Sequence, residues 1–124
     1  MAHVLVIDDD EDHRILAREI LEREGHRVEV AVDGQDGLRR FGKNRPDVVL
    51  TDIHMPGLDG HAVIEALKVL HPDVPIIAVS GGGARDKDEL LLEAMRLGAV
   101  EVITKPFDFR QLLGAVQRAF LLRR

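Results

Sequence analysis

A short apolar segment that ends in a carboxylate most constrains what this chain can fold into. Residues 47–52, with the sequence DVVLTD, place three consecutive apolar residues between Pro46 and a loop rich in Pro and Gly at 56–60. Such a run is typical of a strand buried on both faces, and such strands belong to parallel sheets. In an open parallel α/β sheet, ligands bind beyond the carboxyl ends of the strands. We therefore expect Asp52 to lie where a functional residue would lie.

Short strands and helices alternate along the rest of the chain. Four further segments have the apolar, β-branched character of strands, and a helical pattern follows each; they are residues 4–7, 28–32, 75–79 and 100–103. Strand–helix alternation implies right-handed crossovers with helices on both faces of the sheet. We predict an α/β fold: a doubly wound (βα)5, flavodoxin-like three-layer sandwich with a parallel five-stranded sheet of order 2-1-3-4-5. At 124 residues the chain has the size of one domain, 1–124.

The helical patterns predict which side chains face the core. In the helix after the first strand, capped by Asp10 or Asp12, one side carries Ile15, Leu16, Ile20 and Leu21. The last helix starts after Asp108 as N-cap, and its apolar face is Leu112, Leu113, Val116 and Phe120. The helix over about 86–97 holds more apolar residues than one buried stripe requires, namely Leu90, Leu91, Leu92, Met95 and Leu97. Two interpretations stay open there: ordinary core with one exposed leucine, or a surface for a partner.

Composition excludes several functional classes. The chain has 17 Lys and Arg against 22 Asp and Glu, a net charge of −5, which argues against nucleic acid as a direct ligand and favours a cation. The absence of cysteine excludes disulfides and thiolate metal sites. No signal peptide or segment long enough to span a bilayer is evident in the sequence, so we expect a cytoplasmic protein without membrane contact.

Polar residues stand at the carboxyl ends of four predicted strands. Asp8 and Asp9 follow the first strand, Asp52 the third, Ser80 the fourth and Lys105 the fifth. Because the first and third strands are neighbours in the predicted order, three carboxylates face one another, which is costly without a cation. An oxygen-rich site of this kind suits Mg²⁺ and phosphoryl chemistry. The ammonium can pair with Asp52 or with a phosphoryl group, and the hydroxyl can donate to a phosphoryl oxygen.

These motifs together resemble the receiver domain of two-component response regulators, in the superfamily of the chemotaxis regulator. The resemblance rests on VIDD at 6–9, DIHMPGLDG at 52–60, Ser80 and KPF at 105–107, and it covers essentially the whole chain. It implies that Asp52 accepts a phosphoryl group from a histidine kinase or histidine phosphotransfer protein. It also implies Mg²⁺, with Mn²⁺ as an alternative, bound by Asp9, Asp52 and the backbone carbonyl of His54, with Asp8 acting through water. A cis peptide bond before Pro106 is implied too.

The resemblance also implies a signalling output. Ser80 would move toward the phosphoryl group and change the surface formed by the fourth helix, fifth strand and fifth helix, which would bind a downstream protein or an attached output domain. The chain would catalyse only its own phosphorylation and dephosphorylation; whether phosphorylation also links two copies into a homodimer is left open. The family usually has Tyr or Phe where this chain has Val102, which leaves the aromatic part of the switch open, and Ser80 replaces the commoner Thr.

Three other functions are alternatives for an Asp at the end of a strand in this kind of fold. A phosphatase of the haloacid dehalogenase type expects a second acid two residues after the nucleophile, where this chain has His54. A flavodoxin-like cofactor binder expects Ser, Thr and Gly in the first loop, which is acidic here. A receiver-like module that works without phosphorylation is the remaining alternative.

Some residues near the motifs are predicted to have structural roles or to affect the phosphoryl lifetime. Gly57, Asp59 and Gly60 are interpreted as turn residues. The glycines at 81–83 lack the spacing of a nucleotide-binding loop, and Gly82 is expected to leave the site open to water and to permit rapid loss of the phosphoryl group. The six histidines show no metal-binding spacing, so all except His54 are expected to be solvated.

Overall fold

The computed structural model describes residues 1–55, 57–81 and 87–123, apart from the side chains at 87, 88, 90 and 91. Strands and helices alternate as predicted. In chain order they are β1 (His3–Ile7), α1 (Glu11–Arg23), β2 (Arg27–Ala31), α2 (Gly34–Lys43), β3 (Val48–Asp52), α3 (Gly60–Leu70), β4 (Ile76–Ser80), α4 (Lys87–Leu97), β5 (Glu101–Thr104) and α5 (Phe109–Leu122). The predicted strands 28–32, 75–79 and 100–103 are each shifted by about one residue, because the apolar pattern does not mark where the ladder hydrogen bonds end.

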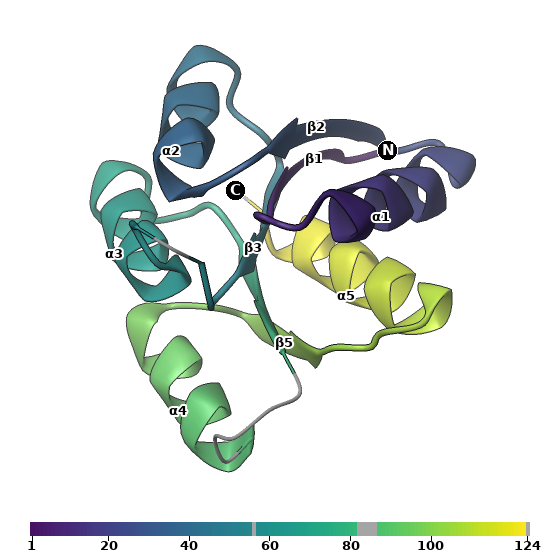
Figure 1. The fold of residues 1–124 in the computed structure, drawn as a ribbon. Helices are drawn as coiled ribbons and strands as arrows, with labels where there is room; N and C mark the ends of the chain where they lie inside the picture. The colour runs from purple at the N-terminus through teal and green to yellow at the C-terminus, as the bar shows by residue number, and fades with distance from the viewer. Residues whose placement is uncertain (56, 82–86, 124) are drawn as a thin grey trace.

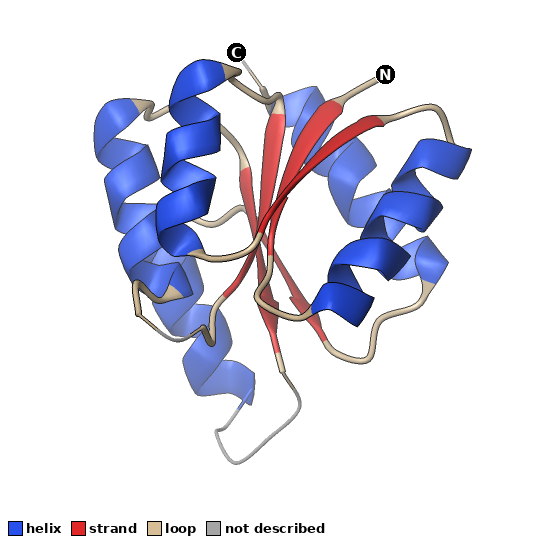
Figure 2. Ribbon diagram, turned by 45° about the horizontal axis from the view of Figure 1, so that its top comes forward, coloured by secondary structure: helices blue, strands red, loops and turns tan. Residues whose placement is uncertain are grey.

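The strands form one parallel sheet of order β2-β1-β3-β4-β5, which confirms the predicted fold class. Figure 1 shows α1 and α5 on one face of the sheet and α2, α3 and α4 on the other, and Figure 2 shows the sheet between the two helical layers. Each face has its own apolar core, one packed against α1 and α5 and the other against α2, α3 and α4. Burial on both faces explains why β3 and β4 are buried along their whole length.

The register of the central strands determines where the polar residues meet. Ile7 of β1 pairs with Thr51 of β3. The residue after each of them, Asp8 in one segment and Asp52 in the other, therefore lies at the same level of the sheet. On the other side of β3, Asp52 pairs with Val79, and Ser80 pairs with Thr104, the residue before Lys105. All four strand ends therefore lie at one edge of the sheet.

Acidic side chains begin most of the helices. Asp10, Asp33, Asp59 and Asp108 are N-caps of α1, α2, α3 and α5, and each carboxylate accepts a hydrogen bond from the backbone N–H three residues later. Asp108 and Gln111 form a capping box. The predicted cap at Asp108 is confirmed, and Asp10 rather than Asp12 caps α1.

The predicted inner face of α1 was partly wrong. Ile15 and Leu16 are 48% and 42% exposed, whereas Ala17 and Leu21 are buried. The apolar pattern passed over Ala17, whose small side chain lets the helix lie close to the sheet and to α5. In α5, by contrast, Leu112 and Val116 are buried as predicted, and Leu113 and Phe120 pack at the margin of the same core.

Part of the interpretation of α4 falls outside the described residues. The side chains of Leu90 and Leu91 are not described, nor are Gly82 and Gly83 in the preceding loop. Among the described side chains, Ala94 is buried while Leu92 and Met95 are 65% and 48% exposed. This result leaves both interpretations of the α4 surface open. Of the helices described, none combines the length and apolar character that a membrane span needs.

Candidate functional site

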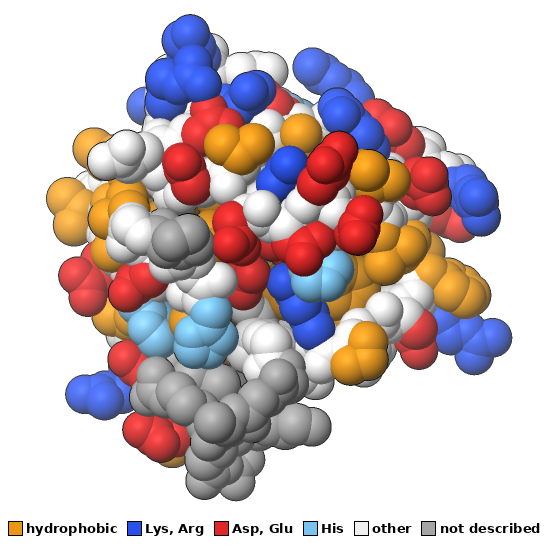
Figure 3. All heavy atoms as spheres, viewed as in Figure 1, with side chains coloured by type: hydrophobic (Ala, Val, Ile, Leu, Met, Phe, Trp, Pro, Cys, Tyr) orange, Lys and Arg blue, Asp and Glu red, His pale blue; other side chains and the backbone are white. Residues whose placement is uncertain are grey.

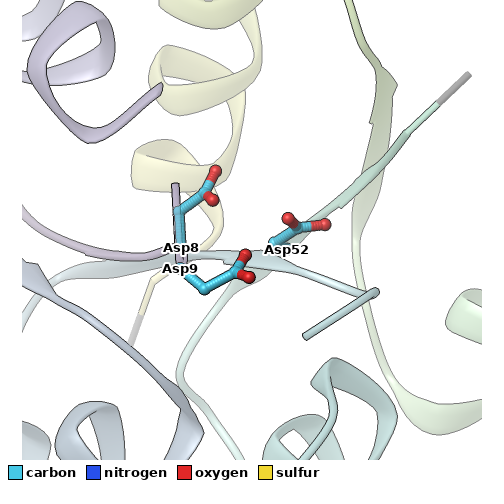
Figure 4. Close-up of side chains that lie close together, drawn as sticks. All are labelled: Asp8, Asp9 and Asp52. Atoms are coloured by element: carbon cyan, nitrogen blue, oxygen red, sulfur yellow. The ribbon is translucent and has the colours of Figure 1, made fainter. Parts of the chain in front are cut away.

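Three carboxylates meet at the carboxyl end of the sheet. Asp8 and Asp9 follow β1 and Asp52 ends β3, and one oxygen of each lies within 4.8 Å of the others. Figure 4 shows the three side chains around one small region between the strand ends. Asp8 and Asp52 are each only 6% exposed, while Asp9 is exposed and borders the solvent. The cluster is thus fixed on the protein side and open on the other.

Backbone groups hold the two buried carboxylates in place. One oxygen of Asp8 (Oδ1) accepts a hydrogen bond from the Asp10 N–H at 2.9 Å, and Oδ1 of Asp52 accepts one from the His54 N–H at 3.2 Å. The guanidinium of Arg14 donates to the backbone carbonyl of Asp8 at 2.8 Å. In both carboxylates these contacts leave Oδ2 for another partner.

That partner is the ammonium of Lys105. Its Nζ lies 3.0 Å from Oδ2 of Asp8 and 3.0 Å from Oδ2 of Asp52. The Lys105 backbone N–H donates to the Ser80 carbonyl at 2.8 Å, which ties the ends of β4 and β5 together. The Lys105-Pro106 peptide bond is cis, as the resemblance implied. Figure 3, in the view of Figure 1, shows acidic side chains around the middle of this face with a basic and a histidine side chain among them.

Burial and pairing act in opposite directions on this group of charges. Burial raises the pKa of the Asp52 carboxyl above its ordinary value, and the nearby Asp8 carboxylate adds to that rise while Lys105 opposes it. Burial alone would lower the pKa of Lys105, but its contacts with Asp52 and Asp8 raise that pKa above the ordinary lysine value. Lys105 therefore stays charged, and among the described residues it is the one Lys or Arg side chain paired with the Asp8 and Asp52 carboxylates.

The remaining predicted residues lie close to this centre. Ser80 is 1% exposed and ends β4, beside the strand that carries Asp52. His54 is exposed and begins the loop after Asp52, but only its N–H has a described contact, so its carbonyl as a metal ligand stays a prediction. Val102 is half-buried in β5 and packs at the margin of the core beneath α2, α3 and α4.

Of the three residues predicted to form the turn, Gly57 lies in it, whereas Asp59 is the N-cap of α3 and Gly60 is its first residue. Gly57 has a φ of +75°, a conformation that L side chains rarely adopt, and Asp59 caps α3 through the Ala62 N–H. A Cβ added to Gly60 would lie 2.2 Å from the carbonyl oxygen of Asp52, so the start of α3 packs directly against the end of β3.

Sequence reasoning missed His13. Its Nδ1 lies 2.8 Å from Nζ of Lys105 and 3.7 Å from Oδ2 of Asp8. The prediction that the histidines other than His54 are solvated was also wrong for two others. His26 accepts a hydrogen bond from the Ala2 N–H, and His71 packs against Phe41. His13 is the third residue of a helix that starts just beyond Asp8, a position from which a side chain can reach the strand ends. Its position in the first turn of that helix was the feature of the sequence that could have predicted a contact with the site.

The donor set suits a hard divalent cation. It consists of carboxylate oxygens, two held by the fold and one at the solvent edge, and it carries more negative charge than Lys105 neutralises. Mg²⁺ typically takes one or two carboxylates and keeps several waters, which matches an open, acid-rich centre of this kind.

Comparison with known proteins establishes the family. The profile described as response regulator receiver domain matches residues 4–117. The chain belongs to this family. It is therefore a receiver domain of the kind found in two-component response regulators, a signalling module. Neither the phosphatase nor the flavodoxin-like cofactor binder is favoured by this assignment.

Individual relatives agree with the family match. The chain is 40% identical to the transcriptional regulatory protein PrrA of Mycobacterium tuberculosis over 121 residues, 98% of this chain and 50% of PrrA. It is 32% identical over 120 residues to sporulation initiation phosphotransferase F of Bacillus subtilis, covering 97% of this chain and 94% of that protein. The receiver domain of NtrX from Brucella abortus superimposes with a TM-score of 0.89 at 36% identity, covering 95% of this chain and 98% of that one. The chain thus spans about half the length of PrrA but nearly all of sporulation initiation phosphotransferase F and of the NtrX receiver domain.

Proposed function

We propose that this receiver accepts a phosphoryl group on Asp52 from a histidine kinase or a histidine phosphotransfer protein. The observation that carries the proposal is the meeting of Asp52 with two further carboxylates and the Lys105 ammonium at one edge of the sheet. A carboxylate nucleophile, a cation-binding acid cluster and a fixed ammonium are what transfer to an aspartate requires.

In the proposed reaction, an oxygen of the Asp52 carboxylate attacks phosphorus in line with the donor's bond. A new bond forms between phosphorus and the Asp52 oxygen, the bond from phosphorus to the phosphohistidine nitrogen breaks, and the nitrogen keeps the electron pair. The Lys105 ammonium, 3.0 Å from Asp52, is placed to neutralise charge on the transferred group. Hydrolysis of the resulting acyl phosphate returns Asp52 to its resting state.

A divalent cation fits the same residues. We propose Mg²⁺, with Mn²⁺ as an alternative, held by the carboxylates of Asp9 and Asp52 and the backbone carbonyl of His54, with Asp8 acting through water. When bound, the cation would supply charge neutralisation at the phosphoryl oxygens. The chain's own part is to hold Asp8 and Asp52 through the N–H groups of Asp10 and His54, so that little rearrangement is needed.

Ser80 and the backbone behind it link the site to the surface. We propose that the Ser80 hydroxyl donates a hydrogen bond to a phosphoryl oxygen. Ser80 would then move toward the phosphoryl group, and this movement would change the surface formed by α4, β5 and α5. The hydrogen bond from the Lys105 N–H to the Ser80 carbonyl links the ends of β4 and β5, so a shift at Ser80 would be passed on to β5. Because Val102 stands where the family usually has an aromatic residue, the switch would act through the connection from β4 to α4 and through α4 itself, and not through the rotamer of an aromatic side chain.

The partners belong to the proposal as well. PrrA is named a transcriptional regulatory protein and is about twice as long as this chain, which supports an output domain or a downstream protein as the receiver's target. We propose residues 1–124 as a single receiver domain that acts in the cytoplasm, contacts neither nucleic acid nor membrane directly, and catalyses no reaction besides its own phosphorylation and dephosphorylation. A phosphorylation-linked homodimer would use the same α4, β5 and α5 surface.

The test separates a receiver from a phosphatase. The protein is incubated with Mg²⁺ and either acetyl phosphate or an aryl phosphate, and chain-bound phosphoryl and released products are counted per chain. A receiver gains at most one acid-stable, base-labile phosphoryl group from acetyl phosphate and does not turn over the aryl phosphate. Sustained turnover of the aryl phosphate, many molecules per chain, would contradict the proposal.

A further inference from the structure

The Lys105 ammonium has three N–H groups, and it has three partners among the residues that the structure describes. These are Oδ2 of Asp8 at 3.0 Å, Oδ2 of Asp52 at 3.0 Å and Nδ1 of His13 at 2.8 Å. An ammonium can only donate, so Nδ1 of His13 is the acceptor in this contact. The three partners come from different elements: the end of β1, the end of β3 and the first turn of α1.

The three contacts differ in what phosphorylation would do to them. In the proposed function, Asp52 becomes an acyl phosphate and Asp8 would also interact with a bound cation through water, so both side chains would attract Lys105 less strongly. The imidazole of His13 takes part in neither event. A ring nitrogen that accepts also competes with the incoming phosphoryl group for the ammonium less strongly than a carboxylate would.

We propose that His13 is a positioning residue that holds the Lys105 ammonium over Asp52 while its two carboxylate partners are engaged elsewhere. The inference rests on the proposed function for its catalytic consequence, but the contact itself does not. His13 touches neither the phosphoryl group nor the donor; it acts through Lys105. The helix supports this role, because the His13 N–H is fixed by the carboxylate of Asp10, the N-cap, at 3.1 Å.

The chain offers variants that separate the acceptor from the ring. His13→Asn places an amide oxygen close to the position of Nδ1 and keeps an acceptor for Lys105, whereas His13→Leu fills similar space without one. Ile15→Ala is the matched control, since Ile15 lies on the same helix, is 48% exposed, and has no described contact with Lys105. His13 is itself part-exposed, at 39% of its side chain, so these changes should leave the fold intact.

The first measurement is the rate of phosphorylation by acetyl phosphate at saturating Mg²⁺, which avoids any effect of α1 on kinase docking. We expect His13→Leu to slow phosphorylation at least tenfold, the effect of one lost hydrogen bond to a charged group of about 1.5 kcal/mol or more, and His13→Asn and Ile15→Ala to stay near the wild-type rate. The second is a double-mutant cycle of His13→Leu and Lys105→Met on the unfolding equilibrium without metal, where we expect a coupling of about fivefold in the unfolding constant.

Each outcome is decisive. If the cycle shows no coupling, His13 and Lys105 do not interact, and the inference fails whatever the phosphorylation rates are. Coupling with an unchanged rate in His13→Leu, or a rate that His13→Asn fails to rescue, would overturn the positioning role. If the wild-type chain gains no phosphoryl group while the cycle shows coupling, the proposed function fails and takes the catalytic consequence with it, whereas the contact stands.

Discussion

At the scale of single residues, the site contains buried carboxylates whose charged form is disfavoured by burial and by their mutual repulsion. Asp52 is a buried carboxylate beside a second one, and its pKa is raised by burial despite the pairing with Lys105. A carboxylate held in this way is less stable in the folded protein than it would be in water. The proposed acceptor is therefore a residue at which stability is given up for reactivity.

Asp52→Asn should accordingly raise the urea midpoint of the metal-free protein at neutral pH. The Asn side chain can still accept from Lys105, and Asp8 still pairs with that ammonium, while one of the crowded charges is gone. The check is a pair of urea titrations at equal pH, with Asp12→Asn, an exposed acid on α1, as the control that should change little. A lower midpoint for Asp52→Asn would show that the Lys105–Asp52 pair outweighs the crowding.

The pH dependence of that difference follows from the direction of the shift. Because the pKa of Asp52 is raised on folding, the native state binds this proton at a higher pH than the unfolded state does, and this group's contribution to stability grows as pH falls through the raised pKa. The advantage of Asp52→Asn should therefore shrink between neutral pH and the ordinary aspartate range. Urea midpoints of both proteins across that range test the sign; an advantage that widens toward acid would contradict it.

At the scale of elements, helix faces and helix starts determine which substitutions the fold tolerates. On α1 the buried positions are Ala17 and Leu21, while Leu16 lies toward solvent beside Phe107 and Phe109. On α3 the first residue, Gly60, lies against the backbone that ends β3. These two elements support the site from opposite faces of the sheet.

Leu21→Ala and Leu16→Ala test the face of α1 with the same chemical change. Leu21 is fully buried, so its truncation should cost about 2–5 kcal/mol, whereas Leu16→Ala should stay within about 0.5 kcal/mol of wild type. Chemical denaturation of both variants provides the measurement. Equal costs would restore the original prediction that Leu16 faces the core.

Gly60→Ala should both destabilise the chain and slow phosphorylation. The added Cβ would lie 2.2 Å from the Asp52 carbonyl oxygen and 2.5 Å from Cα of Ile53, so the backbone that carries Asp52 must move, at a cost of about 1–3 kcal/mol or more. Gly42→Ala in α2 is the control, because nothing lies within 4 Å of its new Cβ, and it should stabilise by about 0.5–1 kcal/mol. Wild-type stability and rate in Gly60→Ala would contradict the packing described.

At the scale of the whole molecule, the sequence was enough to predict most of the fold and most of the site. Buried β-branched strands alternate with helices so regularly that a doubly wound sheet was predicted. The order 2-1-3-4-5, taken as one known order of such sheets, then brought Asp8, Asp9, Asp52 and Lys105 together. The exposure of Ile15 and Leu16 was missed because an alanine can hold the inner face of a helix without a strong apolar signal. His13 was missed because its contact with Lys105 spans 92 residues of sequence and depends on how α1 leaves β1.

Metal binding should appear as a change in global stability. If Mg²⁺ binds the native cluster and not the unfolded chain, a concentration of 100 times its Kd stabilises the protein by about 2.7 kcal/mol. Asp9→Asn should lose most of this gain with little effect on the metal-free protein, because Asp9 is the exposed member of the cluster. Thermal unfolding with and without Mg²⁺ measures it, and an equal gain in Asp9→Asn would exclude that carboxylate as a ligand.

The most direct test of the central claim is the intact mass of the chain after incubation with acetyl phosphate, with and without Mg²⁺, for wild type and Asp52→Asn. The account predicts a gain of about one phosphoryl group in the wild-type protein with Mg²⁺, and none when either the metal or the Asp52 carboxylate is missing. The same gain in Asp52→Asn, or its persistence after the metal is removed, would contradict a metal-dependent transfer to Asp52.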